Sequence, residues 1–224
     1  MTGVWVNLWP HGLTVAVLGY LLGSVSGSLV LGRLQSIDIR AVGSGNAGGT
    51  NALRTRGWRF ALAVVVIDIG KGALAAGAVP AALEAVTATR ATWLALGAVG
   101  GLAAIVGHIW PVYFGFRGGK GAGTAVGAVA VLAPASIGPM FLVWLVTLLI
   151  TGYVGLATIL AGLVLIPAVW WLGPDPVPPA LMSFAIAVAT IIVLTHRGNI
   201  QRLIKGNENR FDTHKLWRRR DRSS

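Results

Sequence analysis

Three polar stretches interrupt a mostly apolar sequence. They read GSGNAGGTNALRTRG at 43–57, GHIWPVYFGFRGGKGAGT at 107–124 and HRGNIQRLIKGNE at 196–208. They bring together glycines, lysine, arginines, two histidines, and Ser, Thr and Asn side chains. Glycine lets the main chain approach a ligand closely, helix N-termini favour negative charge, and Arg binds phosphate oxygens in pairs. The pattern indicates a site for a phosphate-bearing substrate.

The same stretches exclude several other chemistries. Carboxylates are almost absent from them, so neither a metal ion nor hydrolysis by paired acids is expected. The segment FRGGKGAGT is not a nucleotide P-loop, because Phe114 stands where that motif begins with glycine and Gly121 stands where it needs Ser or Thr. The chain has no cysteine, which excludes disulfides and thiolate chemistry.

The elements that must position these stretches are apolar helices. Only 11% of the 224 residues are charged and 55% are hydrophobic, whereas soluble domains carry about 25% charged residues. Several apolar runs approach 20 residues, enough to cross a hydrocarbon core of about 30 Å. The runs are continuous and do not alternate like the strands of a membrane barrel. We predict an all-α, polytopic integral membrane protein.

Proline decides how many helices the runs contain. Pro134 and Pro139 lie in the middle of a 121–151 run, and proline breaks helices. Two short helices therefore replace one long one. The prediction is a single membrane domain, 1–224, with spans at about 11–32, 59–83, 91–114, 121–133, 136–151, 153–173 and 179–195, and a basic tail at 196–224.

The distribution of charge orients this domain. Basic residues gather in 33–58, 115–120 and the tail, while Arg90 is the only basic residue predicted on the opposite side. Because basic residues collect on the cytoplasmic side, we expect the N-terminus outside and the C-terminus in the cytoplasm. All three polar stretches then face the cytoplasm, and the tail can lie on anionic lipid.

The motifs resemble those of a known family. The three stretches have the order and spacing found in the bacterial acyl-phosphate:glycerol-3-phosphate acyltransferases, the PlsY family, and Asp68–Gly72 matches its Asp-x-x-Lys-Gly. The resemblance covers nearly the whole chain. Ala47 and Gly49 depart from the usual GNPGATN, and GKGAGT replaces GKGVAT; both exchanges spare the polar positions.

The resemblance implies a seven-span fold in the bacterial plasma membrane with a cytoplasmic active site. It implies transfer of a fatty acyl group from acyl phosphate to the 1-hydroxyl of sn-glycerol 3-phosphate, giving lysophosphatidic acid and phosphate for phospholipid biosynthesis. No cofactor is implied. The expected partners are the two substrates, membrane lipid and the soluble enzyme that makes acyl phosphate, and no nucleic acid.

Four residues are expected to be catalytic. Lys120 lies between glycines and would neutralise phosphate and the charge developing at the attacked carbonyl. Arg54 would clamp glycerol phosphate, and Ser44 would contact substrate. His196 would orient or deprotonate the attacking hydroxyl, although a His at a helix end also interacts favourably with the dipole. In a further alternative, which we favour, the substrate phosphate accepts the proton and His196 positions the substrate.

Other polar residues are expected to bind substrate, and most have a structural alternative. Thr50 and Asn51, with Ser44 and Asn46, would either bind substrate or cap the second span. Asn199 shares a helical face with His196. In the family a hydroxyl residue near the start of the sixth span touches acyl phosphate, a position that Thr158 would take. The expected set is Gly45, Asn46, Thr50, Asn51, Gly118, Gly119, Gly121, Asn199 and Thr158.

Two further features are expected to be structural. Asp68 and Lys71 lie inside a span, where ionisable groups are costly and usually functional, but their spacing fits an ion pair that stiffens the helix. His108 is as well suited to packing as to catalysis. A transporter of a phosphorylated solute is the rival function; it should show inverted repeats and polar breaks at midplane, whereas these polar residues gather at one face. A scaffold that binds anionic lipid through the tail would leave the glycine stretches unexplained.

Overall fold

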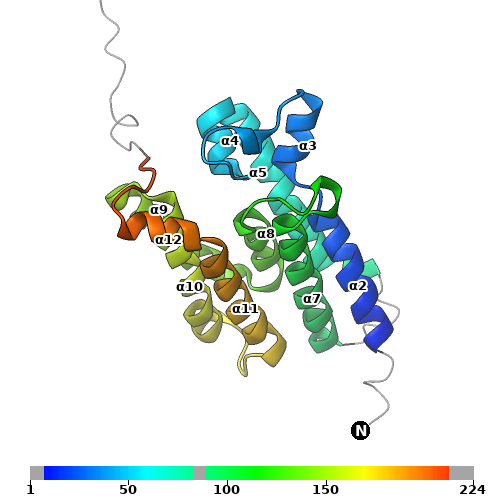
Figure 1. The fold of residues 1–224 in the computed structure, drawn as a ribbon. Helices are drawn as coiled ribbons and strands as arrows, with labels where there is room; N and C mark the ends of the chain where they lie inside the picture. The colour runs from blue at the N-terminus through cyan, green and yellow to red at the C-terminus, as the bar shows by residue number, and fades with distance from the viewer. Residues whose placement is uncertain (1–7, 83–88, 212–224) are drawn as a thin grey trace, which may run out of the picture.

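The computed structural model describes residues 8–82 and 89–211, and the regular elements within these ranges are helical (Figure 1). The all-α prediction is confirmed for this part of the chain. The α-helices are α2 (Leu8–Gly23), α3 (Gly27–Leu34), α4 (Gly49–Arg56), α5 (Trp58–Ala73), α6 (Val79–Ala82), α7 (Arg90–Ile109), α8 (Ala122–Leu132), α9 (Ile137–Thr151), α10 (Val154–Leu172), α11 (Pro179–Thr195) and α12 (Arg197–Ile204). Shorter turns are η1 (Ile39–Ala41), the π-helical η2 (Leu74–Ala78), η4 (Val112–Phe114) and η5 (Pro134–Ser136).

Several of these helices can cross a membrane. Within the described residues, four helical segments are long and apolar enough, and the bent pairs α2–α3 and α11–α12 raise the number to six. Two short helices were expected around Pro134 and Pro139, and α8 and α9 lie there. With 11 residues, α8 is about 17 Å long and too short to cross by itself. Seven spans and the side on which each terminus lies stay predictions.

The first predicted span, 11–32, is not one continuous helix. It is bent by 44° between α2 and α3. Two backbone groups at the break have their hydrogen-bond partners on α5. Lys71 Nζ donates to the Val25 carbonyl at 2.9 Å, and the Gly27 N–H donates to Asp68 Oδ1 at 3.1 Å. A broken helix is tolerated at membrane depth only when such groups are satisfied within the protein.

Small residues bring the helices close together. A Cβ atom on Gly23 of α2 would lie 2.1 Å from the Ala104 carbonyl oxygen of α7, and one on Gly72 of α5 would lie 2.0 Å from the Thr124 carbonyl oxygen of α8. Only glycine permits such an approach, which is a common basis of helix packing in membranes. On the other side of α8, Phe184 and Val188 of α11 join the main core. α8 is thereby held among longer helices.

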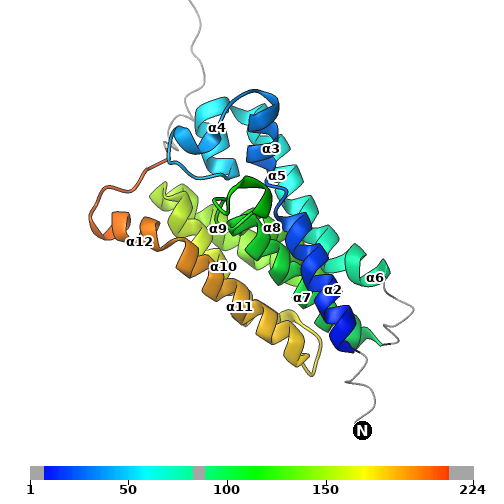
Figure 2. The same cartoon turned by 45° about the vertical axis from the view of Figure 1, so that its right-hand side comes forward.

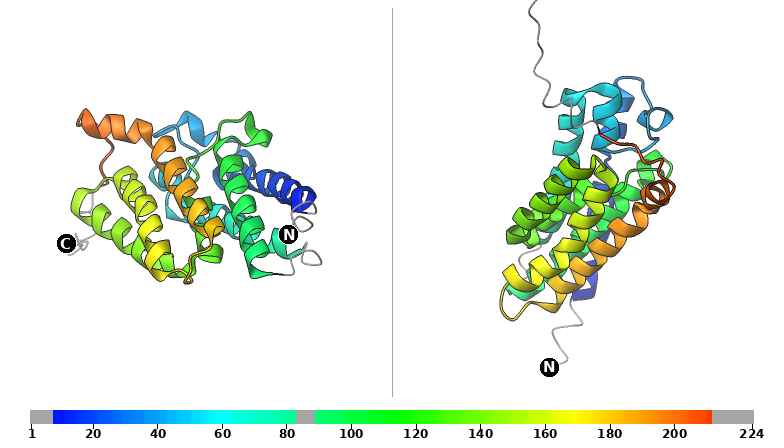
Figure 3. Two further views of the ribbon diagram at one scale, coloured as in Figure 1. Left: turned by 90° about the horizontal axis from the view of Figure 1, so that it is seen from below. Right: turned by 90° about the vertical axis from the view of Figure 1, so that its left-hand side faces the viewer.

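The polar stretches gather at one end of this bundle. Figures 1 and 2 show α3, α4, α12 and the loop before α8 toward one end of the bundle. α2 begins at the opposite end. Figure 3 shows the same arrangement from two other sides. The stretches contain two helices that were not predicted, α4 and α12, and α7 ends at Ile109, earlier than the predicted 114. Pro111 explains this end, because proline disfavours helix at and before its position.

Candidate functional site

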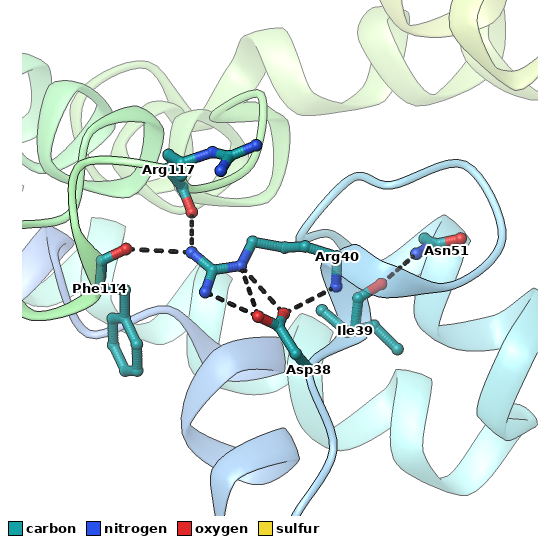
Figure 4. A network of polar contacts seen from close by, with 6 residues as sticks. All are labelled: Asp38, Ile39, Arg40, Asn51, Phe114 and Arg117. Atoms are coloured by element: carbon teal, nitrogen blue, oxygen red, sulfur yellow. Dashed lines mark hydrogen bonds and ion pairs between the residues drawn. The ribbon is translucent and has the colours of Figure 1, made fainter.

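Asp38 and Arg40 lie just before the first polar stretch and connect this part of the chain to the second stretch (Figure 4). Arg40 Nη1 donates to the carbonyls of Phe114 at 3.0 Å and Arg117 at 2.8 Å. Arg40 Nε and Nη2 bind the Asp38 carboxylate, with Nη2 2.8 Å from Oδ2, and the hydrogen bonds from Arg40 hold the pKa of Asp38 below its usual value. The planar guanidinium thus fixes the turn that leads into Lys120. Sequence analysis did not assign these two residues a role.

Asn51 shapes the first stretch from within. Its side chain is buried; Nδ2 donates to the Ile39 and Val42 carbonyls, both at 3.0 Å, and Oδ1 accepts the Ser44 N–H at 2.8 Å. A Cβ on Gly43, whose φ is +63°, would lie 2.2 Å from that oxygen. Asn51 therefore holds the loop that presents Ser44. Its alternative role as a cap of the second span is wrong, because that helix begins after Gly57.

The other polar groups of this stretch are open to a ligand. Ser44, Gly45 and Arg54 are exposed, and Asn46 and Thr50 are half-buried. Thr50 lies inside α4 and does not cap the second span. Gly45, at φ +72°, makes the left-handed turn beside Ser44. Within the described ranges, the side chains of Ser44, Asn46 and Arg54 have no hydrogen-bond or ion-pair partner, so they are free to bind a substrate.

The glycines before Lys120 were expected to bind substrate, but two of them donate their N–H groups to the protein's own backbone. Gly118 N–H donates to the Ile109 carbonyl at 3.0 Å, and Gly119 N–H donates to the His108 carbonyl at 3.1 Å. A Cβ on Gly119 would lie 2.2 Å from His108 Nε2. These glycines let the loop lie against the end of α7. The backbone N–H groups left for an anion are those at the start of α8, which follows Gly121 at φ +84°.

Lys120 lies just before that helix N-terminus and faces the third stretch. Its Nζ donates to Asn199 Oδ1, and its carbonyl accepts the Thr195 hydroxyl at 3.1 Å. Asn199 Nδ2 donates to Glu208 Oε1 at 2.8 Å, and Arg202 Nε donates to Glu208 Oε2 at 2.6 Å. Burial, followed by the charge of Arg202, lowers the pKa of Lys120 to about 8. Glu208 is the only carboxylate in the three stretches, a signal that could have identified it.

His196 lies beside this cluster, immediately after the last residue of α11. Its Nδ1 is 2.8 Å from the Ile192 carbonyl, so Nδ1 carries the proton that it donates and Nε2 is left as an acceptor. Burial, and then the charge of Lys120, lower the pKa of His196 to about 4. The ring is therefore neutral at pH 7 and is a weak base. It is better suited to accept a hydrogen bond from a hydroxyl than to remove its proton.

Thr158 is placed less favourably for substrate. Its hydroxyl donates to the Val154 carbonyl of its own helix at 2.9 Å. Gly155, one turn earlier, lies against the third stretch, because a Cβ there would be 2.6 Å from Asn199 Nδ2. The structure thus brings Gly155, and not the Thr158 hydroxyl, into contact with the Lys120–Asn199 pair.

A buried cluster supports the loop from below. The Lys71 ammonium has three acceptors, namely Asp68 Oδ1 at 2.9 Å, His108 Nδ1 at 2.8 Å and the Val25 carbonyl. Asp68, Lys71 and His108 are all at least 95% buried. The expected ion pair is present, and it also joins the break in the first span to the end of α7, against which Gly119 packs.

No three His, Asp or Glu side chains in residues 8–82 and 89–211 are arranged to hold a metal ion.

Comparison with known proteins shows the family to which the chain is similar. A family model described as "Glycerol-3-phosphate acyltransferase" matches residues 13–206. A glycerol-3-phosphate acyltransferase of Chlorobaculum parvum is 39% identical over 222 residues, covering 89% of this chain and 96% of the relative. One of Aquifex aeolicus is 38% identical over 199 residues, covering 89% and 98%.

A solved structure agrees with these relatives. The crystal structure of PlsY (YgiH), an integral membrane glycerol 3-phosphate acyltransferase in its glycerol 3-phosphate form, has a TM-score of 0.79 and 35% identity. The comparison covers 93% of this chain and 99% of that one. A second form of that protein, with lysophosphatidic acid, gives a TM-score of 0.78 at 34% identity. From its sequence and its fold, the chain belongs to the glycerol-3-phosphate acyltransferase family.

Proposed function

We propose that this membrane protein transfers a fatty acyl group from acyl phosphate to the 1-hydroxyl of sn-glycerol 3-phosphate, at the cytoplasmic face of the bacterial plasma membrane. The products are lysophosphatidic acid and inorganic phosphate. The observation that carries the proposal is the position of Lys120, between the N-terminus of α8 and the Asn199 side chain and close to His196. Family membership, and a relative crystallised with glycerol 3-phosphate and with lysophosphatidic acid, support it.

The reaction needs little beyond positioned charge. The hydroxyl oxygen attacks the acyl carbonyl carbon, a tetrahedral oxyanion forms, and the bond from carbon to the phosphate oxygen then breaks. The Lys120 ammonium and the start of α8 would stabilise the oxyanion and the leaving phosphate. Arg54 and Ser44 would bind glycerol 3-phosphate. The neutral Nε2 of His196 would accept a hydrogen bond from the 2-hydroxyl of glycerol 3-phosphate and so orient the substrate, which leaves the proton of the 1-hydroxyl free for transfer.

The proton must leave the hydroxyl as the new ester bond forms. With a pKa of about 4, His196 is poorly matched to removing a proton at neutral pH. The phosphate of glycerol 3-phosphate is the alternative acceptor, and we assign it that role. Acyl phosphate and glycerol 3-phosphate then give lysophosphatidic acid and phosphate with no proton acceptor from the protein. The soluble enzyme that makes acyl phosphate would supply the donor.

One assay tests the proposed reaction directly. Purified protein in lipid would be incubated with acyl phosphate and glycerol 3-phosphate, without metal or nucleotide, and phosphate and lysophosphatidic acid measured together. Equal yields of both products, dependent on glycerol 3-phosphate, are expected. Folded protein that gives no product from acyl phosphate would rule the proposal out and favour transport of a phosphorylated solute.

The rate should fall at alkaline pH. Burial lowers the pKa of Lys120 to about 8, so its charged form is present below that pH and is lost above it. We expect kcat/KM to decline about tenfold per pH unit above pH 8, because this constant reports the free enzyme. A Lys120→Arg variant, if active, should lack the decline, since guanidinium stays charged. A flat wild-type profile to pH 10, after correction for spontaneous hydrolysis of acyl phosphate, would contradict the role of Lys120.

The Asp38–Arg40 pair should matter for activity although it is remote from the reacting atoms. Arg40→Lys keeps the charge, but a single nitrogen replaces the planar fork whose Nε and Nη2 bind both carboxylate oxygens of Asp38 while Nη1 reaches the two carbonyls. We expect kcat/KM to fall on the order of 10–100-fold, the loss produced by a displacement of about 1 Å. The alkaline decline should also move upward, because a looser loop exposes Lys120.

The matched control for this variant is Arg33→Lys. The Arg33 guanidinium lies over the Phe114 ring, 5.0 Å from its centroid, but it makes no link to the carbonyls of the loop. We expect the control to keep the wild-type rate and the wild-type pH profile. If Arg40→Lys also kept the wild-type rate and pH profile, the Asp38–Arg40 pair would have no part in positioning Lys120.

A further inference from the structure

A groove between α3 and α5 lies apart from the site described above. It has a volume of about 410 Å³ and is lined by Leu31 and Gln35 of the α3 end, Arg56 of α4, and Arg59, Phe60 and Ala63 of α5. Its size falls within the range of roughly 300–1,000 Å³ typical of ligand pockets. Apolar side chains form its floor and two guanidinium groups its rim, so it matches an amphiphilic anion.

The two arginines face one groove because of a single glycine. Gly57 adopts φ +83° and ψ 177°, a conformation almost restricted to glycine, and separates α4 from α5. The chain changes direction there, and Arg56 and Arg59 line the same groove although they belong to different helices. Gln35 Oε1 accepts a hydrogen bond from Arg56 Nη2 at 3.0 Å and so holds that guanidinium in place.

No carboxylate neutralises these charges in the described part of the chain. The ion pairs there are Asp38–Arg40, Asp68–Lys71 and Arg202–Glu208. Arg59 instead lies over the Trp58 ring, 5.4 Å from its centroid. Two guanidinium groups without a counter-charge, one of them fixed by a neutral amide, can bind phosphate oxygens.

The surroundings of the groove are those of a lipid-facing surface. Leu34, Trp58 and Leu62 are 78%, 64% and 54% exposed, and Val65 and Val66 continue this apolar strip along α5. In an integral membrane protein, exposed apolar side chains on a helix face acyl chains, and Trp marks the level of the headgroups. The groove therefore places its arginines at headgroup level and its apolar floor below them.

We propose that the α3–α5 groove binds an anionic phospholipid of the bilayer, with the phosphate between Arg56 and Arg59 and an acyl chain along Leu31, Phe60 and Ala63. A soluble phosphate would not need the apolar floor. Phe60 also packs, with Ile39 and Ala47, in the small core beneath the first polar stretch. A bound lipid would thus support the loop that carries Ser44.

Lipid binding can be measured without any assay of the reaction. Protein in neutral detergent would be titrated with phosphatidylglycerol or phosphatidylcholine, and bound lipid counted by native mass spectrometry. Wild type should bind one phosphatidylglycerol in preference to phosphatidylcholine. Arg56→Gln/Arg59→Gln should bind it on the order of 10–30-fold more weakly. Lys205→Gln/Arg90→Gln removes the same charge elsewhere and should bind like wild type.

A second variant separates a built site from a general attraction of charges. Ala63→Phe leaves every charge in place and fills the floor of the groove, so it should also lose the bound phosphatidylglycerol. Thermal unfolding without added lipid checks that each variant is folded. Equal binding by wild type and the double Arg variant, equal binding of both lipids, or displacement of the lipid by free glycerol 3-phosphate would each overturn the proposal.

Discussion

Lys120→Ala should abolish measurable turnover while the protein stays folded. The ammonium is the one group that would meet both the leaving phosphate and the developing oxyanion. Loss of one such preorganised donor costs on the order of 10²–10³ in rate. The loss of phosphate binding adds to this cost. We therefore expect kcat/KM, measured by release of phosphate and lysophosphatidic acid, to fall at least that far.

The rest of the loop explains why the fold should survive this change. Lys120 is half-buried, and its side chain is linked to Asn199, which keeps Glu208 as a partner when the ammonium is gone. The backbone carbonyl that binds Thr195 is unchanged. Lys205→Ala is the matched control, since Lys205 is exposed after the end of α12. If Lys120→Ala worked at the rate of that control, Lys120 would not belong to the site.

Much of the framework could be predicted because it depends on local sequence. Apolar runs marked where the long helices lie, and Pro134 and Pro139 marked the interruption between α8 and α9. Lys120 and Asn199, assigned to the site from separate stretches, lie in direct contact. The three stretches lie at the ends of apolar helices. The order of the apolar runs along the sequence already predicted that these helix ends would lie at the same end of the bundle.

The remainder depends on contacts between distant residues. The break between α2 and α3 requires Lys71 as the partner of Val25 and Asp68 as the partner of Gly27, and nothing in the first run alone reveals them. The N–H groups of Gly118 and Gly119 looked free for phosphate, but the end of α7 accepts them.

The hydrogen bonds from Arg40 to the Phe114 and Arg117 carbonyls also could not be predicted, because they join residues more than 70 positions apart. A glycine-rich pattern indicates that the loop can approach another segment closely, but it does not identify that segment. The short helices α4 and α12 were also missed, because each has only 8 residues, fewer than the window of about 11–18 residues in which apolar periodicity is recognised.

Asp68→Ala, unlike Lys120→Ala, should lower the stability of the fold. The Asp68 and Lys71 side chains are 5% and 3% exposed and lie 2.9 Å apart. Removal of the carboxylate leaves a buried ammonium without its counter-charge and the Gly27 N–H without its acceptor. Loss of one partner from a buried pair costs about 3–5 kcal/mol. At about 2–4 °C per kcal/mol for a chain of this size, the unfolding midpoint in detergent should fall on the order of 6–20 °C.

An exposed pair in the same protein is the matched control. Asp38 and Arg40 are 48% and 28% exposed, and such pairs contribute about 0–1 kcal/mol. Asp38→Ala should therefore keep the unfolding midpoint within a few degrees, while it frees Arg40 and lowers the rate. Asp68→Ala/Lys71→Met, which removes both buried charges, should recover part of the lost stability. An unfolding midpoint for Asp68→Ala equal to that of Asp38→Ala would show that the buried cluster does not hold the break in the first span.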